Sequence, residues 1–149
     1  MTIAIIYASV HHKNTEKLIT AIAEKHLEIT IIDTTKAVMI DLAKYDMIGI
    51  ASGIYMGKFH KSIYSFIQDN LPEHKKVFLM YTCGSDNKKY IEDFKSFIAE
   101  KQPLIKGIFS CKGFDTAIPV FKLIGGINKG HPDKKDVENA VQFVENMIK

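Results

Sequence analysis

Cysteine is scarce in this sequence, with only two among 149 residues. Cys83 and Cys111 stand far apart and form no C-x-x-C pair, which argues against a zinc site and against thioredoxin-type chemistry. We therefore expect no bound metal and two reduced, half-buried thiols.

Long apolar runs and concentrated charge are also missing. No apolar run reaches the length of a membrane span, and the first residues carry neither a basic segment nor a cleavage site, so we expect a cytoplasmic protein with no membrane span. The net charge is only +3 and the twenty Lys and Arg residues are spread along the chain, so nucleic-acid binding is not expected. Ordinary contents of hydrophobic residues, 46%, and charged residues, 25%, predict one globular domain over residues 1–149.

Several familiar loop patterns are absent. Residues 9–15, which follow the first apolar run, contain no glycine, and this excludes the fingerprint of nicotinamide-binding domains; the P-loop pattern is missing as well. A phosphoacceptor receiver domain needs an Asp at the end of the third strand, where this chain has Ser52. Cys83 is followed six positions later by Lys89 rather than Arg, which does not support a cysteine phosphatase.

Apolar runs and helical patterns alternate along the whole chain. Strands are expected at residues 2–8, 28–33, 46–52, 77–83 and 104–111. Four helices are expected, with apolar faces that carry Leu18, Ile19, Ile22 and Ala23; Ile63, Phe66 and Ile67; Tyr90, Ile91, Phe94, Phe97 and Ile98; and Val137, Ala140, Val141, Val144 and Met147. Asn14 or Thr15 can cap the first helix, and the second ends before Pro72. Residues 38–44 are expected to be weakly helical or irregular, and residues 112–132 irregular.

Most of the expected strands are apolar on both faces, which is typical of a parallel sheet covered by helices on both sides. The predicted fold class is therefore α/β, with a doubly wound sheet. In such sheets, ligands bind outside the carboxyl ends of the strands, where the strand order reverses. The loops after the first, third, fourth and fifth strands are the expected binding segments.

Three of these loops carry candidate binding groups. Residues 9–15 offer hydroxyls, an amide and the N–H groups of a helix N-terminus, which suit a phosphate, although a capped helix with a polar loop explains them equally well. Residues 52–62 place two glycines around an aromatic residue, so that the backbone can approach a flat ligand, or serve only as a turn. Residues 82–87 are small and polar, which suits either a heterocycle edge or a simple turn. Their meeting at one end of one sheet favours a shared ligand.

The chain resembles the flavodoxin family over nearly its whole length. The most specific match is Ser-Gly-Ile-Tyr-x-Gly-Lys-Phe-His-Lys at residues 52–61; residues 9–15, 82–84 and 111–115 and the glycines at 125, 126 and 130 also match. The resemblance implies a flavodoxin-like five-stranded sheet of order 2-1-3-4-5 with helices on both faces. It also implies FMN, bound without a covalent link, and a role in shuttling one or two electrons between a reductase and an acceptor protein. A monomer or weak dimer is expected.

The resemblance also implies which residues bind FMN. The phosphate falls to the loop at 9–15, the isoalloxazine ring to residues 53–57 with Tyr55 stacking on it, and the pyrimidine side to residues 82–84. A backbone carbonyl near Met56 or Gly57 is the expected partner of flavin N5. The full set is Ser9, Val10, His11, His12, Lys13, Asn14, Thr15, Ser52, Gly53, Ile54, Tyr55, Met56, Gly57, Thr82, Cys83 and Gly84.

Two features depart from the flavodoxin pattern. Lys13 stands where a glycine commonly precedes the Asn-Thr pair, which bears on the phosphate geometry. The chain is also basic, with a sequence pI of about 8.7, where typical flavodoxins are strongly acidic. Lys58 and Lys61, if they lie beside the ring, favour the negatively charged reduced flavin and make the potential less negative.

Other functions remain open on this scaffold, because a fold does not determine a function. The pattern Tyr55-x-Gly57-x-x-His60 is also similar to menaquinone-dependent protoporphyrinogen oxidase, an FMN-dependent oxidoreductase, although this chain is shorter and lacks much of that enzyme's insertion. An electron carrier is favoured over such an enzyme. A domain that has lost its flavin is the third alternative.

Two further expectations concern individual segments. His60 is either a proton donor near flavin N5 or a helix-start residue facing solvent, and the second is favoured. The segment 112–132 serves as a lid, a partner surface or a packed connection. We expect its apolar side chains to pack on the domain, namely Ile118, Val120, Phe121, Leu123 and Ile124.

Overall fold

Five parallel strands form one sheet in the computed structural model, which describes residues 1–36, 39–116 and 119–149. The strands are β1 (Ile3–Ala8), β2 (Thr30–Asp33), β3 (Met47–Gly53), β4 (Lys76–Cys83) and β5 (Leu104–Lys112). Their order across the sheet is β2-β1-β3-β4-β5, and each neighbouring pair runs parallel. The predicted fold class and strand order are confirmed.

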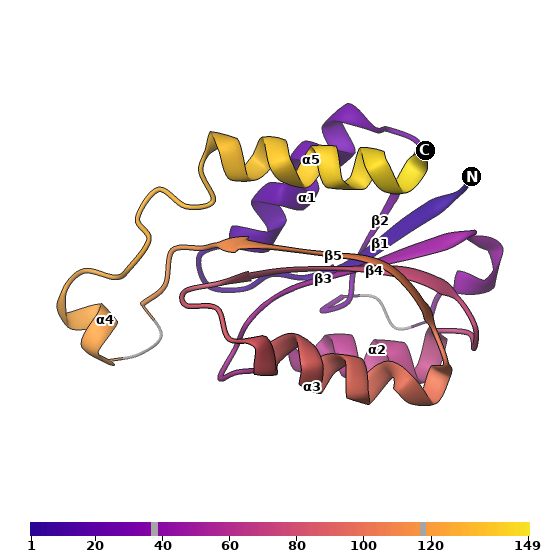
Figure 1. Ribbon diagram of the computed structural model, residues 1–149, viewed down its shortest axis with the longest axis horizontal. Helices are drawn as coiled ribbons and strands as arrows, with labels where there is room; N and C mark the ends of the chain where they lie inside the picture. Colours follow the sequence, from indigo (N-terminus) through magenta and orange to yellow (C-terminus); the bar gives the residue numbers. More distant parts are fainter. Residues whose placement is uncertain (37–38, 117–118) are drawn as a thin grey trace.

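Helices cover both faces of the sheet (Figure 1). One face carries α1 (Asn14–Lys25) and α5 (Lys134–Ile148), and the other carries α2 (Lys61–Asn70) and α3 (Lys88–Ile98). Short 3₁₀ turns form at Leu42–Lys44 and Ala99–Lys101. The first of these lies in the stretch expected to be weakly helical or irregular, of which residue 38 lies outside the described part. No helix in the described ranges is long and apolar enough to cross a membrane.

Successive side chains of each strand point to opposite faces of the sheet, and this divides the core into two layers. On β1, Ala4 and Ile6 pack in the layer of α2 and α3, whereas Ile3 and Ile5 pack in the layer of α1 and α5. All seven residues of β3 are buried, which is expected for a central strand covered on both faces. β2 is shorter than predicted, because the N–H of Ile29 donates to the carbonyl of His26 at 3.0 Å in the preceding turn.

One aromatic contact fixes the loop between β3 and α2. Phe59 is 2% exposed, and its ring stacks on Phe94 of α3 with the ring centroids 4.0 Å apart. This contact anchors the loop in the core just before α2 and leaves the preceding turn at the edge of the sheet.

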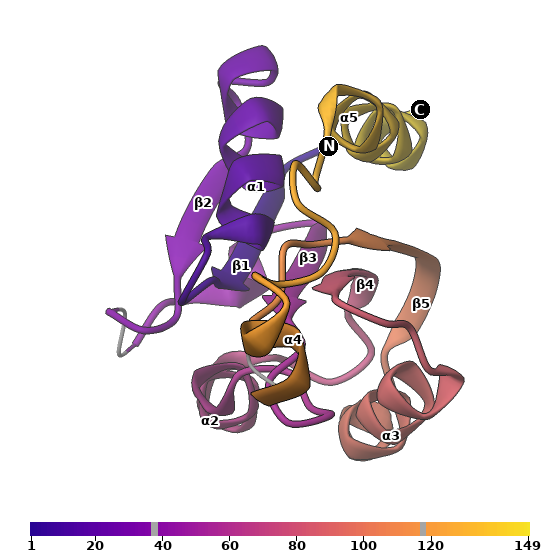
Figure 2. The same cartoon turned by 90° about the vertical axis from the view of Figure 1, so that its left-hand side faces the viewer.

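The segment after β5 differs from the prediction. It contains a short helix, α4 (Pro119–Leu123), which lies beyond the carboxyl ends of the strands (Figures 1 and 2). The predicted packing of Val120, Leu123 and Ile124 on the domain is wrong, since their exposed fractions are 58%, 85% and 67%. A five-residue helix that projects from the sheet edge has too little adjacent surface to bury them. Phe121 is partly buried, and Ile118 lies outside the described residues.

Gly49 provides a test of how tightly the sheet is packed. A Cβ at this position of β3 would overlap the ring of Phe78 on β4 and lie 3.0 Å from Cγ1 of Ile5. We expect Gly49→Ala to lower the free energy of unfolding by about 1–3 kcal/mol, measured by urea denaturation. In a Phe78→Leu background the ring is absent, so Gly49→Ala should lower the free energy of unfolding by less than about 1 kcal/mol. Equal costs in both backgrounds would show that the ring does not set the limit.

Candidate functional site

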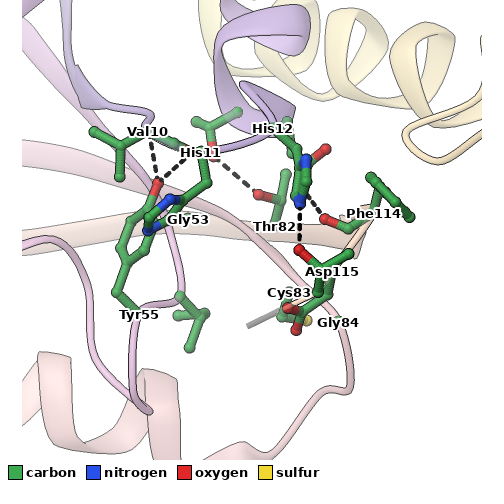
Figure 3. A pocket seen from close by; sticks show the side chains of 14 residues that line it. Val10, His11, His12, Gly53, Tyr55, Thr82, Cys83, Gly84, Phe114 and Asp115 are labelled. Carbon is green, nitrogen blue, oxygen red and sulfur yellow. Dashed lines mark hydrogen bonds between the residues drawn. The ribbon is translucent and has the colours of Figure 1, made fainter. Parts of the chain in front are cut away.

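A cavity of about 410 Å³ lies at the carboxyl edge of the sheet, and we call it the edge cavity. It is bounded by the loops after β1, β3, β4 and β5 (Figure 3). β1 has β2 on one side and β3 on the other, so this edge includes the point where the strand order reverses. The lining residues are Val10, His11, His12, Asn14, Thr15, Gly53, Ile54, Tyr55, Thr82, Cys83, Gly84, Phe114, Asp115 and Thr116.

The loop after β1 directs the N-terminus of α1 toward the edge cavity. Asn14 and Thr15 are the first two residues of this helix, and both line the cavity. The partly positive N–H groups of a first helical turn attract an anion. The hydroxyl of Ser9 closes the loop, because its Oγ accepts from the N–H of Glu16 at 3.0 Å.

The prediction that Asn14 or Thr15 caps α1 is wrong. The N-cap is Lys13, in the left-handed region with φ 58°, and its side chain makes no capping hydrogen bond. The two predicted caps instead bond to other loops: Asn14 Nδ2 donates to the carbonyl of Phe114 at 2.9 Å, and the hydroxyls of Thr15 and Thr82 share a hydrogen bond of 3.0 Å. Their side chains therefore join the loops rather than the helix end.

The loop after β3 is a tight turn whose base is held by hydrogen bonds of Ser52. The hydroxyl of Ser52 donates to the carbonyl of Gly53 at 2.7 Å and accepts from the N–H of His60 at 2.9 Å. At the turn, Tyr55 and Lys58 exchange backbone hydrogen bonds of 2.7 and 3.1 Å. Met56 is 96% exposed at the tip of this turn.

Tyr55 forms one wall of the edge cavity. Its hydroxyl accepts from the N–H of Val10 at 2.8 Å, which ties the loop after β3 to the loop after β1 (Figure 3). Burial raises the pKa of Tyr55, so the phenol is neutral at pH 7 and its hydroxyl keeps its proton. The path of this side chain requires glycine at position 53, where a Cβ would lie 2.8 Å from the Tyr55 hydroxyl.

The opposite wall comes from the loops after β4 and β5. Asp115 approaches Gly84 so closely that a Cβ at Gly84 would overlap its carboxyl group. Asp115 is held by the returning chain, since its backbone exchanges hydrogen bonds of 3.1 and 2.9 Å with Ile127. Asn128 Nδ2 donates to the carbonyl of Gly84 at 2.6 Å and joins the two loops further.

The loop after β5 was expected to bind a ligand, but none of its residues was among the predicted site residues. Phe114, Asp115 and Thr116 all line the edge cavity. His12 Nε2 and the hydroxyl of Thr116 share a hydrogen bond of 2.9 Å, which links this loop to the first one. The available signal was the rule that ligands bind beyond the carboxyl ends of strands, which applies to the fifth strand as well.

Eleven of the sixteen predicted residues line the edge cavity, and the others lie around it. Ser9 and Ser52 hold their loops in shape through the hydrogen bonds given above, and Lys13 is the N-cap of α1. Met56 and Gly57 form the tip of the turn after β3, with φ of 52° and 80°.

His60 is the N-cap of α2, as the favoured of its two interpretations predicted. Its Nδ1 accepts from the N–H of Ser62 at 3.1 Å, and its ring meets the Tyr55 ring edge-on with the centroids 5.3 Å apart. The side chain is partly buried rather than turned fully to solvent. Burial, and secondarily the charge of Lys61, lower the pKa of His60, which favours the neutral ring at pH 7.

The thiol of Cys83 in the edge cavity is predicted to be unreactive. Burial raises its pKa to about 12, with smaller contributions from Asp86 and Asp115, so on the order of one molecule in 10⁴ carries the thiolate at pH 8. In a Cys111→Ser variant, we expect a disulfide reagent to label Cys83 at least about tenfold more slowly in the native state than in urea. Equal labelling rates in the two states would contradict the burial.

Comparisons with known proteins place the chain among relatives. Residues 4–113 match the family described as flavodoxin domain. An uncharacterized protein of Methanocaldococcus jannaschii is 39% identical over 152 residues, covering 100% of this chain and 99% of that protein.

Solved structures share the fold at low sequence identity. A flavodoxin from the domain Archaea superposes with a TM-score of 0.66 at 14% identity, covering 99% of each chain. A flavoprotein from Lactobacillus acidophilus, solved in complex with FMN, superposes with a TM-score of 0.58 at 16% identity, covering 73% of this chain and 92% of that one. The match to the family over residues 4–113, together with this fold, shows that the chain belongs to the flavodoxin family.

Proposed function

We propose that the protein binds FMN in the edge cavity and transfers electrons between redox partners. The observation that carries this proposal is the edge cavity itself, which has a helix N-terminus among its walls and lies at the reversal point of a flavodoxin sheet. Its volume of about 410 Å³ falls in the range of small-molecule sites. The walls supply the three kinds of contact that FMN needs: an anion site, an aromatic face and backbone groups.

Each wall has a separate task in this proposal. The first turn of α1 would bind the phosphate through its N–H groups, with Asn14 and Thr15 beside it. Tyr55 and Gly53 would lie against the ring, and residues 82–84 would bind its polar edge through the backbone. When bound, FMN supplies reversible chemistry of one or two electrons. The chain binds and orients the cofactor and excludes water from it.

The neutral phenol of Tyr55 suits a wall against which a flavin ring would lie. Because burial raises the pKa of Tyr55, the side chain places no negative charge in the edge cavity near pH 7. Its hydrogen bond to Val10 also joins the proposed ring-binding loop to the proposed phosphate-binding loop. Movement of either loop therefore affects the other.

The proposal extends to the cell compartment and the assembly. Cys83 and Cys111 are both free, which is compatible with a reducing, cytoplasmic location. We propose a single domain over residues 1–149 that acts as a monomer or weak dimer, with a reductase and an acceptor protein as partners.

An FMN-dependent oxidoreductase is the second candidate. One observation favours it: a second cavity of about 630 Å³ adjoins the first on the other side of Tyr55. Comparing reduction by a flavodoxin reductase with direct turnover of quinones or porphyrinogens separates the two functions. Fast reduction without turnover supports the carrier, and turnover without a partner protein supports the enzyme.

Adding a negative charge at the start of α1 tests the phosphate site. We expect Asn14→Asp to raise the dissociation constant for FMN at least about tenfold, because the new carboxylate repels the phosphate. The dissociation constant for riboflavin, which has no phosphate, should change by less than about twofold. Fluorescence quenching of each flavin measures both constants.

The matched control for this test is Asn87→Asp. Asn87 is the N-cap of α3 at the same edge of the sheet, its Oδ1 accepts from the N–H of Lys89, and it does not line the edge cavity. The control makes the same chemical change, and we expect it to alter the dissociation constant for FMN very little. Equal losses of FMN and riboflavin affinity in Asn14→Asp would contradict a phosphate at this helix.

The exposed end of α4 and the turn that follows it offer a docking surface for a redox partner. Leu123 and Ile124 are exposed beside Lys122. The amine of Lys129 lies over the nearby turn, because a Cβ added at Gly125 would be 3.5 Å from it. An apolar patch with lysines around it fits a partner with an apolar centre and an acidic rim. The helix lies beyond the same strand ends that bound the edge cavity (Figure 2).

Replacing the two apolar residues tests this docking surface. We expect Leu123→Ser/Ile124→Ser to raise the KM for reduction by a flavodoxin reductase by about fivefold or more, since each buried anchor contributes to the complex, while the FMN affinity is unchanged. Leu27→Ser is the matched control, because Leu27 is 86% exposed and lies just before β2, at the opposite edge of the sheet. A normal KM in the double variant would exclude α4 from the contact.

A further inference from the structure

A second cavity shares a wall with the edge cavity, and we call it the outer cavity. It measures about 630 Å³ and lies between the loop after β1, the loop after β3 and the first turns of α2. Val10, His11 and Tyr55 line both cavities, so these residues form the partition between them. Tyr55 is held in that partition by its hydrogen bond of 2.8 Å from the N–H of Val10.

Part of the outer cavity is aromatic. Phe59 is 2% exposed and anchored on Phe94, so its contribution to the wall is rigid. Tyr64 of α2 meets the Phe94 ring edge-on with the centroids 5.7 Å apart, which fixes its position as well. Tyr55 completes this set of aromatic walls. A ligand with a flat, apolar body can lie against the rings of Tyr55 and Tyr64, which are only partly buried.

The rest of the outer cavity is cationic. Lys58 and Lys61 both line it and are exposed, so their amines can reach a ligand at its mouth. None of its nine described lining residues is Asp or Glu. Asp33 is the acidic group whose charge acts on the nearby His60, and its carboxylate is already engaged by Thr35 and Lys36. Positive charge therefore dominates the opening of the cavity.

We propose that the outer cavity is a binding site for a small organic anion with an aromatic body. A neutral aromatic molecule would leave the two lysines without a partner, and a free inorganic anion would leave the aromatic walls uncovered. The combination fits a molecule that carries a carboxylate, sulfonate or phosphate group on a flat ring system. This inference deepens the proposed function, because it places a small-molecule ligand next to the proposed flavin.

The partition gives the two cavities a common wall. A ligand in the outer cavity contacts the same Tyr55 and Val10 that wall the edge cavity, and any factor by which its binding changes the affinity for FMN is the factor by which FMN changes its own affinity. The outer cavity therefore offers the protein a way to sense or select the small molecule that meets the flavin.

The test uses two dyes with the same rings and different charge. 8-Anilinonaphthalene-1-sulfonate is an aromatic anion, and N-phenyl-1-naphthylamine is its neutral counterpart. With the protein saturated with FMN, so that the edge cavity is filled, we expect the anion to bind at least about tenfold more tightly than the neutral dye. Fluorescence titration measures both constants.

A pair of double lysine variants tests whether Lys58 and Lys61 bind the anionic dye. We expect Lys58→Gln/Lys61→Gln to weaken binding of the anionic dye about fivefold to tenfold and to leave the neutral dye unchanged. The matched control is Lys44→Gln/Lys76→Gln, which removes the same charge at the opposite, amino-terminal edge of the sheet. Because the dye can also adsorb to α4, the titrations are repeated in the Leu123→Ser/Ile124→Ser background.

Amide chemical shifts locate the bound dye. Perturbations at residues 58–65 support the proposal; perturbations confined to residues 119–124 or 82–84, or equal affinity in the two lysine variants, overturn it. The outcome is separable from FMN binding, which is measured independently by flavin fluorescence. If the protein binds no FMN, the same shifts are recorded in its absence, and perturbation of 58–65 still supports an anion site.

Discussion

Burial of both faces of the parallel sheet is the constraint on which the rest of this structure depends. With β3 wholly buried and helices on either side, the polar side chains of the core gather at the carboxyl edge. Among the described residues, the buried polar ones are Ser9, Thr15, Thr34, Ser52 and Thr82, and they lie near the carboxyl end of a strand or in the segment that follows it. Each of these side chains forms a hydrogen bond, which makes the edge both polar and well ordered.

Close approach of the loops depends on glycine at three positions. Side chains at Gly53, Gly84 and Gly113 would collide with Tyr55, Asp115 and Asn14. Those three partners are the groups that cross between loops and define the edge cavity. The glycines therefore let neighbouring side chains cross between the loops, a role that the pattern in the sequence did not suggest.

The regular part of the fold could be predicted from the sequence because it depends on local periodicity. Apolar runs marked all five strands, and the spacing of Tyr90, Ile91 and Phe94 marked α3. The strand order followed from the resemblance to flavodoxins. Contacts between distant loops could not be predicted in the same way: the bonds from Asn14 to Phe114 and from Thr15 to Thr82 join residues far apart in the chain, and they overruled the local preference for a cap.

The same limit applied to the segment after β5. Its apolar composition suggested burial, but α4 extends beyond the sheet and leaves Leu123 and Ile124 exposed. Composition reports how apolar a segment is, whereas its position relative to the core is set by the chain on either side. Here the backbone pairing of Asp115 with Ile127 closes the segment into a loop at the edge of the sheet. The exposed residues then become candidates for contact with another protein.

The edge cavity is the proposed FMN site, with a proposed partner surface at α4 and a second cavity behind Tyr55. A crystal structure of the protein grown with saturating FMN tests this most directly. We expect the phosphate at the N-terminus of α1 and the ring between Tyr55 and residues 82–84. FMN bound elsewhere, or an edge cavity without flavin density at saturating concentration, would contradict it.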